Sequence, residues 1–372
     1  MKNETGKRGF IFRMQMILCK RIEAVFPYKK QASESNSVKK RSILFLACFC
    51  LAILLQGCGF FAADRPKSTI KVYTTLDKSF LETLCSRYSD GLPADKKVAF
   101  TILDHETDLA QADCMISDIK RLEEKAAGGS LQKIQAEYGD LLPSELKDRE
   151  DRWIILFYDP VVVLVNQAYS RKAGQRQIMR WLDLPSRKDA QFVMENLSDN
   201  DSTVMFLAAM SSRMGQNEFF DWFRQLRPQI KQYARFPITP VRMAATGDAD
   251  IAITRRSHVF KYLQNDFPAY ILLPAEGTPV NLYGIGITKT TKQQKELTAF
   301  VNWLLQAPEA RTALLATRSG YLPVLPQGEQ GQTVNMDKLW LNTYYKEEKA
   351  IAKLTEDWLK EIRLADAGEA KK

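Results

Sequence analysis

A hydrophobic run near the middle of the chain, Trp153–Asn166, limits the possible folds more than any other segment. Most of its residues are β-branched, aliphatic or aromatic, which predicts a long β-strand. The run is interrupted once, by Asp159-Pro160. Because proline has no N–H group to give to a β-ladder, the interruption predicts a kink, a sheet edge or a crossover between sheets.

The segment before this run alternates between strand-like and helix-like patterns. Short hydrophobic stretches predict strands at Ile70–Tyr73, Val98–Leu103 and Ala112–Ser117. Between the first two, Ser79–Glu82 has the form of a capping box and starts a stretch with apolar residues at helical spacing. Strands that alternate with helices in this way are typical of a parallel α/β layer.

The remainder of the chain continues in the same style. A second crossover strand is predicted at Gly277–Ile287. The other expected elements are helices around 119–138, a strand at Phe192–Met194, helices from Thr203 and around Phe219–Phe223, a strand after the turn at Gly247–Asp250, an amphipathic helix over Leu297–Leu305 and a long helical tail at Asp337–Leu364.

The N-terminal region predicts export. Lys39-Lys40-Arg41 precede the apolar stretch Ile43–Leu55, and Leu55-Gln56-Gly57-Cys58 resembles the bacterial lipobox. We therefore expect residues 1–57 to be a leader, Cys58 to carry lipid and residues 58–67 to be a tether. The apolar stretch is short for a membrane span, which needs about 20 residues. The alternative is an uncleaved anchor that continues through Gly59–Ala63, and a true start within 1–41 would explain the unusually long basic region.

Charge argues against nucleic acid as a partner. The chain has 53 Lys and Arg against 44 Asp and Glu, but residues 1–57 hold 11 of the basic residues and only 3 of the acidic ones. The rest of the chain is therefore close to neutral, whereas nucleic-acid binding depends on a basic surface.

Few cysteines are expected in the folded part. Outside the leader and Cys58, only Cys85 and Cys114 remain, without CxxC or metal-ligand spacing. Export permits a disulfide between them, and two separately buried thiols are the alternative.

A series of motifs in a fixed order resembles one protein family. VYTTLD at Val72–Asp77 is similar to that family's first strand and ligand loop, and EGTPVN at Glu276–Asn281 is similar to its return strand. The family is that of the type II periplasmic solute-binding proteins of ABC importers, in the group that takes up iron(III), thiamine, 2-aminoethylphosphonate and phosphoglycerate. Further segments that match its motifs are Trp181–Pro185, Gln232-Tyr233, Pro240-Val241, Ala245–Ile253, Gly284–Ile287 and Tyr321–Val324.

The resemblance implies an α/β fold of two lobes, each a mixed, mainly parallel sheet flanked by helices, joined by two crossover strands. It implies that lobe 1 comprises 68–158 and 285–372, and that lobe 2 comprises 159–284. Such lobes close on a ligand about a hinge. Ligands in sheets of this type bind beyond the carboxyl ends of the strands.

The expected ligand-binding residues end a strand or open a helix in one of the family's ligand loops. They are Thr74, Thr75, Asp118, Tyr158, Ser202, Thr203, Thr239, Arg255 and Tyr283. Several also have a structural interpretation: helix capping for Thr74, Thr75 and Asp118, and hinge packing for the two tyrosines. At least one of the neighbours Arg255 and Arg256 is expected to be merely solvated. Arg255 is the important candidate, because a guanidinium can bind a carboxylate or phosphate with two parallel hydrogen bonds.

Two departures from the family bear on the ligand. Arg255-Arg256 stands roughly where iron-binding members have a tyrosine pair, and two cations would repel a ferric ion. Phe236–Thr239 replaces a loop that often binds an anion in relatives. We expect a small ligand with an anionic group, such as a phosphonate, phosphate ester or carboxylate. A zwitterion would additionally use Asp118 or Asp201.

These features predict a substrate-binding lipoprotein that delivers its solute to an ABC permease in the inner membrane. A sensory protein that signals to a membrane kinase, or a binder of iron(III) or thiamine, is the alternative. Two histidines, His105 and His258, and the absence of hydrolase, metalloprotease or nucleotide-binding signatures argue against an enzyme. No cofactor or metal is expected, and the protein is expected to be a monomer.

Overall fold

The computed structural model describes residues 68–173, 178, 180–263, 267–324, 335–342 and 347–365. The predicted leader, Cys58 and tether lie outside these residues. Within the described part of the chain, no helix combines the length and apolar character needed to cross a membrane.

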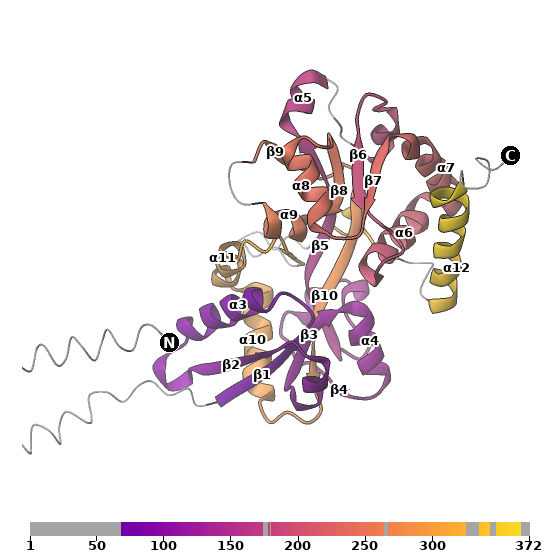
Figure 1. Ribbon diagram of the computed structural model, residues 1–372. Coiled ribbons are helices and arrows are strands. Elements are labelled where there is room, and N and C mark those ends of the chain that lie inside the picture. Colours follow the sequence, from indigo (N-terminus) through magenta and orange to yellow (C-terminus); the bar gives the residue numbers. More distant parts are fainter. Residues whose placement is uncertain are drawn as a thin grey trace, which may run out of the picture. The chain divides into compact units, whose positions relative to one another are not determined.

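The described chain forms two α/β lobes, drawn at the bottom and top of Figure 1. The elements of the lower lobe are β1 (Ser68–Thr74), α3 (Lys78–Gly91), β2 (Val98–Leu103), β3 (Cys114–Asp118), α4 (Ile119–Ala127), β4 (Leu131–Gln132), α10 (Gln294–Gln306), α11 (Pro308–Ala316) and β11 (Leu322–Pro323).

The upper lobe is built around the parallel strands β6, β7 and β8. Its elements are α5 (Gln167–Ala173), β6 (Phe192–Glu195), α6 (Asp201–Met214), α7 (Gln216–Leu226), β7 (Ile230–Ala234), α8 (Ile238–Thr246), β8 (Ile251–Arg255), α9 (Arg256–Tyr262) and β9 (Ala269–Leu272). Two short elements near the C-terminus, β12 (Leu339–Trp340) and α12 (Glu348–Trp358), complete the set.

Two long strands, β5 (Trp153–Asn166) and β10 (Thr278–Thr288), run from one lobe into the other. The strand order is β2-β1-β3-β10-β5-β8-β6-β7. β5 pairs with β10 as far as Pro160 and with β8 from Val161 onward. The change of partner falls at the proline, where a ladder donor is missing, so the predicted crossover at this break is confirmed.

The far half of β5 is apolar on both faces because helices cover both sides of the upper sheet. Val161, Val163 and Val165 belong to a core cluster with side chains of α6 and α7. Val162 and Leu164 belong to a second cluster, with side chains of α8 and α9. A strand buried on both faces has a continuous apolar sequence instead of an alternating one.

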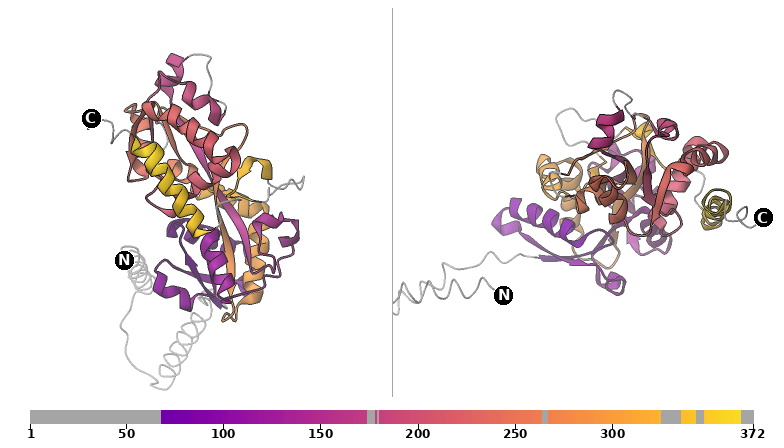
Figure 2. Two further views of the ribbon diagram at one scale, coloured as in Figure 1. Left: turned by 90° about the vertical axis from the view of Figure 1, so that its right-hand side faces the viewer. Right: turned by 45° about the horizontal axis from the view of Figure 1, so that its top comes forward.

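The C-terminal helix does not follow the expected lobe assignment. The sequence placed residues 285–372 in lobe 1, but Leu354, Trp358 and Ile362 are buried in the core cluster of the upper lobe. Figure 2 shows the yellow helix α12 against the upper lobe. These three residues recur at helical spacing and so form one apolar face, but periodicity does not reveal which core such a face covers.

Two predicted helices are shorter than expected. The helix predicted around 119–138 ends at Ala127, since Gly128 and Gly129 follow and Gly129 adopts a positive φ of 70°. The predicted tail at 337–364 contains the short strand β12, and helix α12 begins only at Glu348.

Cys85 and Cys114 are free thiols, both buried in the core of the lower lobe. Burial raises the pKa of each thiol, and Cys85 raises that of Cys114 further. Of the two possibilities left open by the sequence, the structure has the separate buried thiols.

Candidate ligand-binding site

A cavity of about 2230 Å³ lies between the two lobes, bordered by loops at the carboxyl ends of the strands. Drug-sized ligands occupy pockets of roughly 300–1,000 Å³, so a small solute would fill only part of it. The cavity extends away from the crossover strands into a groove between α4 and α12. The part next to β5 and β10 contains the partly buried charged groups described below.

The lower wall of the cavity follows β1 and β3, which are parallel and end at the same edge of the sheet. Thr75 follows β1, and its Oγ1 lies 2.9 Å from Ser117 Oγ on β3. Asp118 ends β3 and caps α4, since its Oδ1 accepts a hydrogen bond of 3.1 Å from Arg121 N. The Arg121 guanidinium donates to Tyr73 Oη at 2.8 Å.

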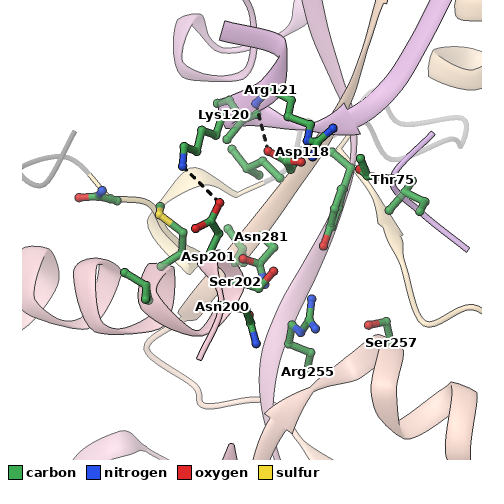
Figure 3. A pocket seen from close by; sticks show the side chains of 18 of the residues that line it. Thr75, Asp118, Lys120, Arg121, Asn200, Asp201, Ser202, Arg255, Ser257 and Asn281 are labelled. Carbon is green, nitrogen blue, oxygen red and sulfur yellow. Dashed lines mark hydrogen bonds and ion pairs between the residues drawn. The ribbon is translucent and has the colours of Figure 1, made fainter. Parts of the chain in front are cut away.

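The upper wall follows β6 and β8, which are also parallel. The N-terminus of α6 contributes Asn200, Asp201 and Ser202 to the cavity. Arg255 ends β8 and directs its guanidinium toward the lower wall (Figure 3). One hydrogen-bond donor of this side chain, Nε, is buried and has no partner among the described residues.

A buried carboxyl lies behind Arg255. Asp159, on the crossover strand β5, is 0% exposed and accepts hydrogen bonds from Ser257 N at 2.9 Å and Ser257 Oγ at 2.6 Å. Burial raises the pKa of Asp159, although Arg255 and Ser257 act in the opposite direction. The carboxyl therefore anchors the start of α9 and contributes negative potential beside Arg255.

Neighbouring groups keep Arg255 a cation despite its burial. Burial acts to lower its pKa, but Tyr283, Asp159 and Glu195 raise it, and the net shift is upward. Burial raises the pKa of Tyr283 to about 12 and also raises that of Tyr321. Near neutral pH the part of the cavity next to β5 and β10 therefore contains the Arg255 guanidinium and the protonated phenols of Tyr283 and Tyr321.

The cavity-facing carboxylates nearest to the crossover strands already have protein partners. Asp201 Oδ2 lies 3.2 Å from Lys120 Nζ, and Asp77 Oδ2 lies 3.1 Å from Lys261 Nζ. Asp118 accepts from Arg121 N and from Ser117 Oγ. The acidic groups in this part of the site are therefore already hydrogen-bonded or ion-paired within the protein.

The structure brings five of the nine predicted residues together at the cavity: Thr75, Asp118, Ser202, Arg255 and Tyr283. The other four are described residues that do not line it.

The hydroxyls of two excluded threonines serve a local turn and a helix cap. Thr74 is 1% exposed, and its Oγ1 accepts from Leu76 N at 2.9 Å. Thr203 forms a capping box with Asn200. Thr239 lies in the first turn of α8, with its N–H bonded to Phe236 O, and does not cap this helix.

Tyr158 packs against the core of the lower lobe instead of facing the cavity. It pairs with Leu282 and with Leu322 across the crossover sheet. Hinge packing is therefore its observed role.

Several residues at the site were not predicted. Asn281 lies beside Asp159 on the paired crossover strands, and both Asn281 and Lys120 line the cavity. Tyr321 follows the turn at Gly320 and has its ring centroid 5.4 Å from that of Tyr283. Tyr321 is part of a matching family motif, which could have marked it. Lys120 has no such signal, because its role depends on the opposing lobe.

The described residues contain no cluster of three or more His, Cys, Asp or Glu side chains that could hold a metal ion. Both buried phenols lie beside the Arg255 cation, which disfavours a hard cation at the same place.

Comparison with known proteins agrees with the fold. Residues 166–342 match the family model of bacterial extracellular solute-binding proteins. An uncharacterised protein of Haemophilus influenzae is 27% identical over 208 residues, covering 54% of this chain and 60% of that protein. Iron uptake protein A1 of Synechocystis is 22% identical over 231 residues, covering 58% of this chain and 62% of that protein. The chain thus spans about three fifths of the length of these curated relatives.

Solved structures share the two-lobe architecture. The periplasmic binding protein AfuA of Actinobacillus pleuropneumoniae, with fructose 6-phosphate bound, superimposes with a TM-score of 0.56 at 20% identity, over 80% of this chain and 99% of that chain. Identity at this level shows the fold alone. The predicted fold class, two α/β lobes joined by crossover strands, is confirmed.

Proposed function

We propose that this chain is a type II periplasmic solute-binding protein that captures a small anionic solute between its lobes. Its fold and its family match over residues 166–342 support this proposal. In this proposal the protein is exported, is held at the membrane by lipid on Cys58 and acts as a monomer. It delivers the solute to an ABC permease and performs no chemistry on it. The crossover strands near Tyr158–Val161 and Val280–Gly284 serve as the hinge between the lobes.

The observation that carries this proposal is the Arg255 guanidinium in the cavity. It is partly buried, and its Nε donor has no partner among the described residues. A desolvated guanidinium with a free donor favours a carboxylate, phosphate or phosphonate oxygen, because charge-assisted hydrogen bonds are the strongest that a side chain makes. Thr75, Ser202 and Asn281 supply further polar groups around it.

The charge balance favours an anion over a cation or zwitterion. The nearest cavity carboxylates are engaged by Lys120, Lys261 and the start of α4. A cationic ligand group would have to displace one of these partners, whereas an anionic group meets Arg255 directly. That AfuA binds a sugar phosphate in a related fold is in keeping with this ligand class.

Ferric ion fits the site less well. One relative is an iron uptake protein, but the described residues hold no cluster of three or more carboxylate, cysteine or histidine side chains suited to a metal. Burial raises the pKa of Tyr283 and Tyr321, which disfavours the phenolate form that binds iron.

The test is a thermal-shift screen of the full-length protein in detergent. The panel contains organophosphonates, phosphorylated three-carbon acids, sugar phosphates, thiamine, polyamines and ferric citrate. We expect a phosphate- or phosphonate-bearing compound to raise the melting temperature, since a ligand that binds only the folded state stabilises it. Unchanged mass of the bound compound after incubation would agree with binding without chemistry.

Calorimetry with Arg255→Ala then tests whether the Arg255 guanidinium binds the ligand. Loss of a desolvated arginine–anion pair costs on the order of 2–5 kcal/mol of binding free energy. Arg256→Ala is the matched control, because Arg256 does not line the cavity and instead donates to Gly320 O. A polyamine as the only hit, or unchanged affinity in Arg255→Ala, would exclude the anionic assignment.

A further inference from the structure

Side chains from three secondary-structure elements form a chain of hydrogen bonds at the cavity wall. Arg255 and His258 both line the cavity, whereas Glu195 lies behind them. Arg255 Nη2 lies 2.5 Å from His258 Nε2. His258 Nδ1 lies 2.9 Å from Glu195 Oε1, and Glu195 ends β6. The side chains of His258 and Glu195 are only 9% and 8% exposed.

The chemistry of these groups fixes where the imidazole proton lies. A guanidinium has donors only, so the contact between Arg255 and His258 requires Nε2 to be an acceptor without a proton. The remaining proton of the neutral ring is then on Nδ1, which donates to the Glu195 carboxylate. The network thus selects one tautomer of a neutral histidine.

A neutral imidazole holds Arg255 without neutralising it. If Glu195 contacted the guanidinium directly, the pair would satisfy the cation and compete with an incoming anion. The ring of His258 instead accepts one N–H from Arg255 and donates its own N–H to Glu195. The Glu195 carboxylate is therefore separated from the guanidinium by the imidazole ring. Asp159 is the other carboxyl near Arg255, and both of its oxygens accept hydrogen bonds from Ser257.

The groups that face His258 come from each element packed around it. Arg255 faces it from β8, Glu195 from β6 and Asp159 from β5, while the ring of Tyr262, on its own helix, has its centroid 6.3 Å away. Among these groups, Arg255 and Glu195 are the ones hydrogen-bonded to the ring. The orientation of the imidazole is therefore set by a cation on one side and an anion on the other.

We propose that Glu195 and His258 are positioning residues that orient the Arg255 guanidinium toward the cavity and leave its charge available to an anionic ligand. This inference rests on the proposed function. It adds the two residues that hold the Arg255 guanidinium in position to bind an anion. Groups whose own orientation is fixed by a supporting hydrogen bond bind ligands more tightly, because less ordering remains to be done on binding.

The tautomer is tested by NMR on the full-length protein labelled with ¹⁵N-histidine. The chain has only two histidines, and His105→Gln assigns the signals by removing the exposed one. We expect His258 at neutral pH to show a protonated Nδ1 and an unprotonated Nε2. An imidazolium, or the opposite tautomer, would overturn the proposed network.

The effect on binding is tested with 3-phosphoglycerate and inorganic phosphate as probes, by calorimetry well below the melting temperature of each variant. His258→Leu and Glu195→Leu should weaken binding about tenfold or more, the usual effect of losing a supporting partner of a ligand group. His258→Gln should restore most of the affinity, because its amide oxygen can accept from Arg255. A purely structural role would lower the melting temperature without changing the affinity of the folded protein.

The outcomes separate this inference from the function on which it rests. If the wild-type protein binds a probe and folded His258→Leu binds it equally well, the positioning role is wrong and the anion-binding function stands. If the wild-type protein binds neither probe nor any other anion of the screen, the proposed ligand class fails, and the positioning role fails with it.

Discussion

At the scale of single residues, Asp159 lies where β5 passes from one lobe into the other, and it stabilises the structure at that place. Its carboxyl is fully buried, joins the crossover strand to the N-terminus of α9 through Ser257, and lies beside Arg255. A buried charge is tolerated only when hydrogen bonds and an opposite charge compensate for the loss of water.

We expect Asp159→Ala to lower the free energy of unfolding by about 3 kcal/mol, because it leaves the N–H and hydroxyl of Ser257 without their buried acceptor. Urea denaturation measures the change. Asp104→Ala, at a side chain that is 44% exposed, is the control and should alter stability by less than about 0.5 kcal/mol. Equal stability of the two variants would contradict a structural role for the buried carboxyl.

The pH dependence has a definite sign. Because burial raises the folded-state pKa of Asp159, its contribution to stability is fully present below the unfolded-state value of about 3.9. That contribution is lost as the pH rises through the higher folded-state pKa. Stability curves of the wild type and Asp159→Asn should therefore differ in slope over this range, with the wild type losing more.

At the scale of secondary-structure elements, the C-terminal helix α12 is part of the upper lobe. Trp358 is 0% exposed, and its ring centroid lies 5.9 Å from that of Phe223 on α7 and 6.0 Å from that of Tyr233 on β7. The chain thus returns from the lower lobe, through α10 and α11, to complete the core of the upper one. This packing ties the C-terminus to elements more than a hundred residues earlier.

Trp358→Ala should reduce the free energy of unfolding by about 3–5 kcal/mol, the usual cost of removing a buried tryptophan. Lys353→Ala, on the same helix with its side chain 74% exposed, is the matched control. Hydrogen exchange adds location: the amides of β7 and α7 should lose protection more than those of β1 and α3. Equal loss in both lobes would mean that α12 supports the whole molecule.

At the scale of the whole described unit, two exposed ion pairs connect the lobes across the cavity. Lys120 on α4 pairs with Asp201 on α6, and Lys261 on α9 pairs with Asp77 before α3. Exposed pairs of this kind contribute about 0–1 kcal/mol each and weaken with salt. Because together they stabilise the contact between the lobes only slightly, they would allow the two lobes to separate again and release a ligand.

We expect a ligand identified in the screen to make the protein more compact, as closure of two lobes does, and small-angle scattering measures this. Without ligand, Lys120→Met combined with Lys261→Met should increase the radius of gyration, and high salt should do the same to the wild type. Lys353→Met is the control, since Lys353 pairs with Asp357 within one helix. An unchanged radius with saturating ligand would contradict the clamp.

Acid should act on the same contacts. The Ser79 hydroxyl, together with Lys261, lowers the pKa of Asp77, so the ion pair is present above about pH 4. It is lost as the pH falls through the lowered folded-state value. Below that pH the radius of ligand-free protein should approach that of the single variant Lys261→Met.

The sequence by itself determined the parts of this protein that depend on local pattern. The apolar run interrupted at Asp159-Pro160 predicted a crossover, and the alternation of strands and helices predicted an α/β fold. The strand-end positions of Thr75, Asp118 and Arg255 brought them into one cavity. Hydrophobic periodicity and the missing N–H of proline involve residues that are close in the chain, so their effects can be predicted from the sequence alone.

Only the tertiary structure decided which distant groups meet. Glu195 and His258 are far apart in the chain, and no motif marks their contact with Arg255. Helix α12 had a recognisable apolar face, but either lobe could have covered it. Thr74 and Thr203 looked equivalent to Thr75, but their hydroxyls bond to backbone groups nearby instead of lining the cavity. Burial and charge pairing depend on long-range packing, and a one-dimensional pattern does not contain that information.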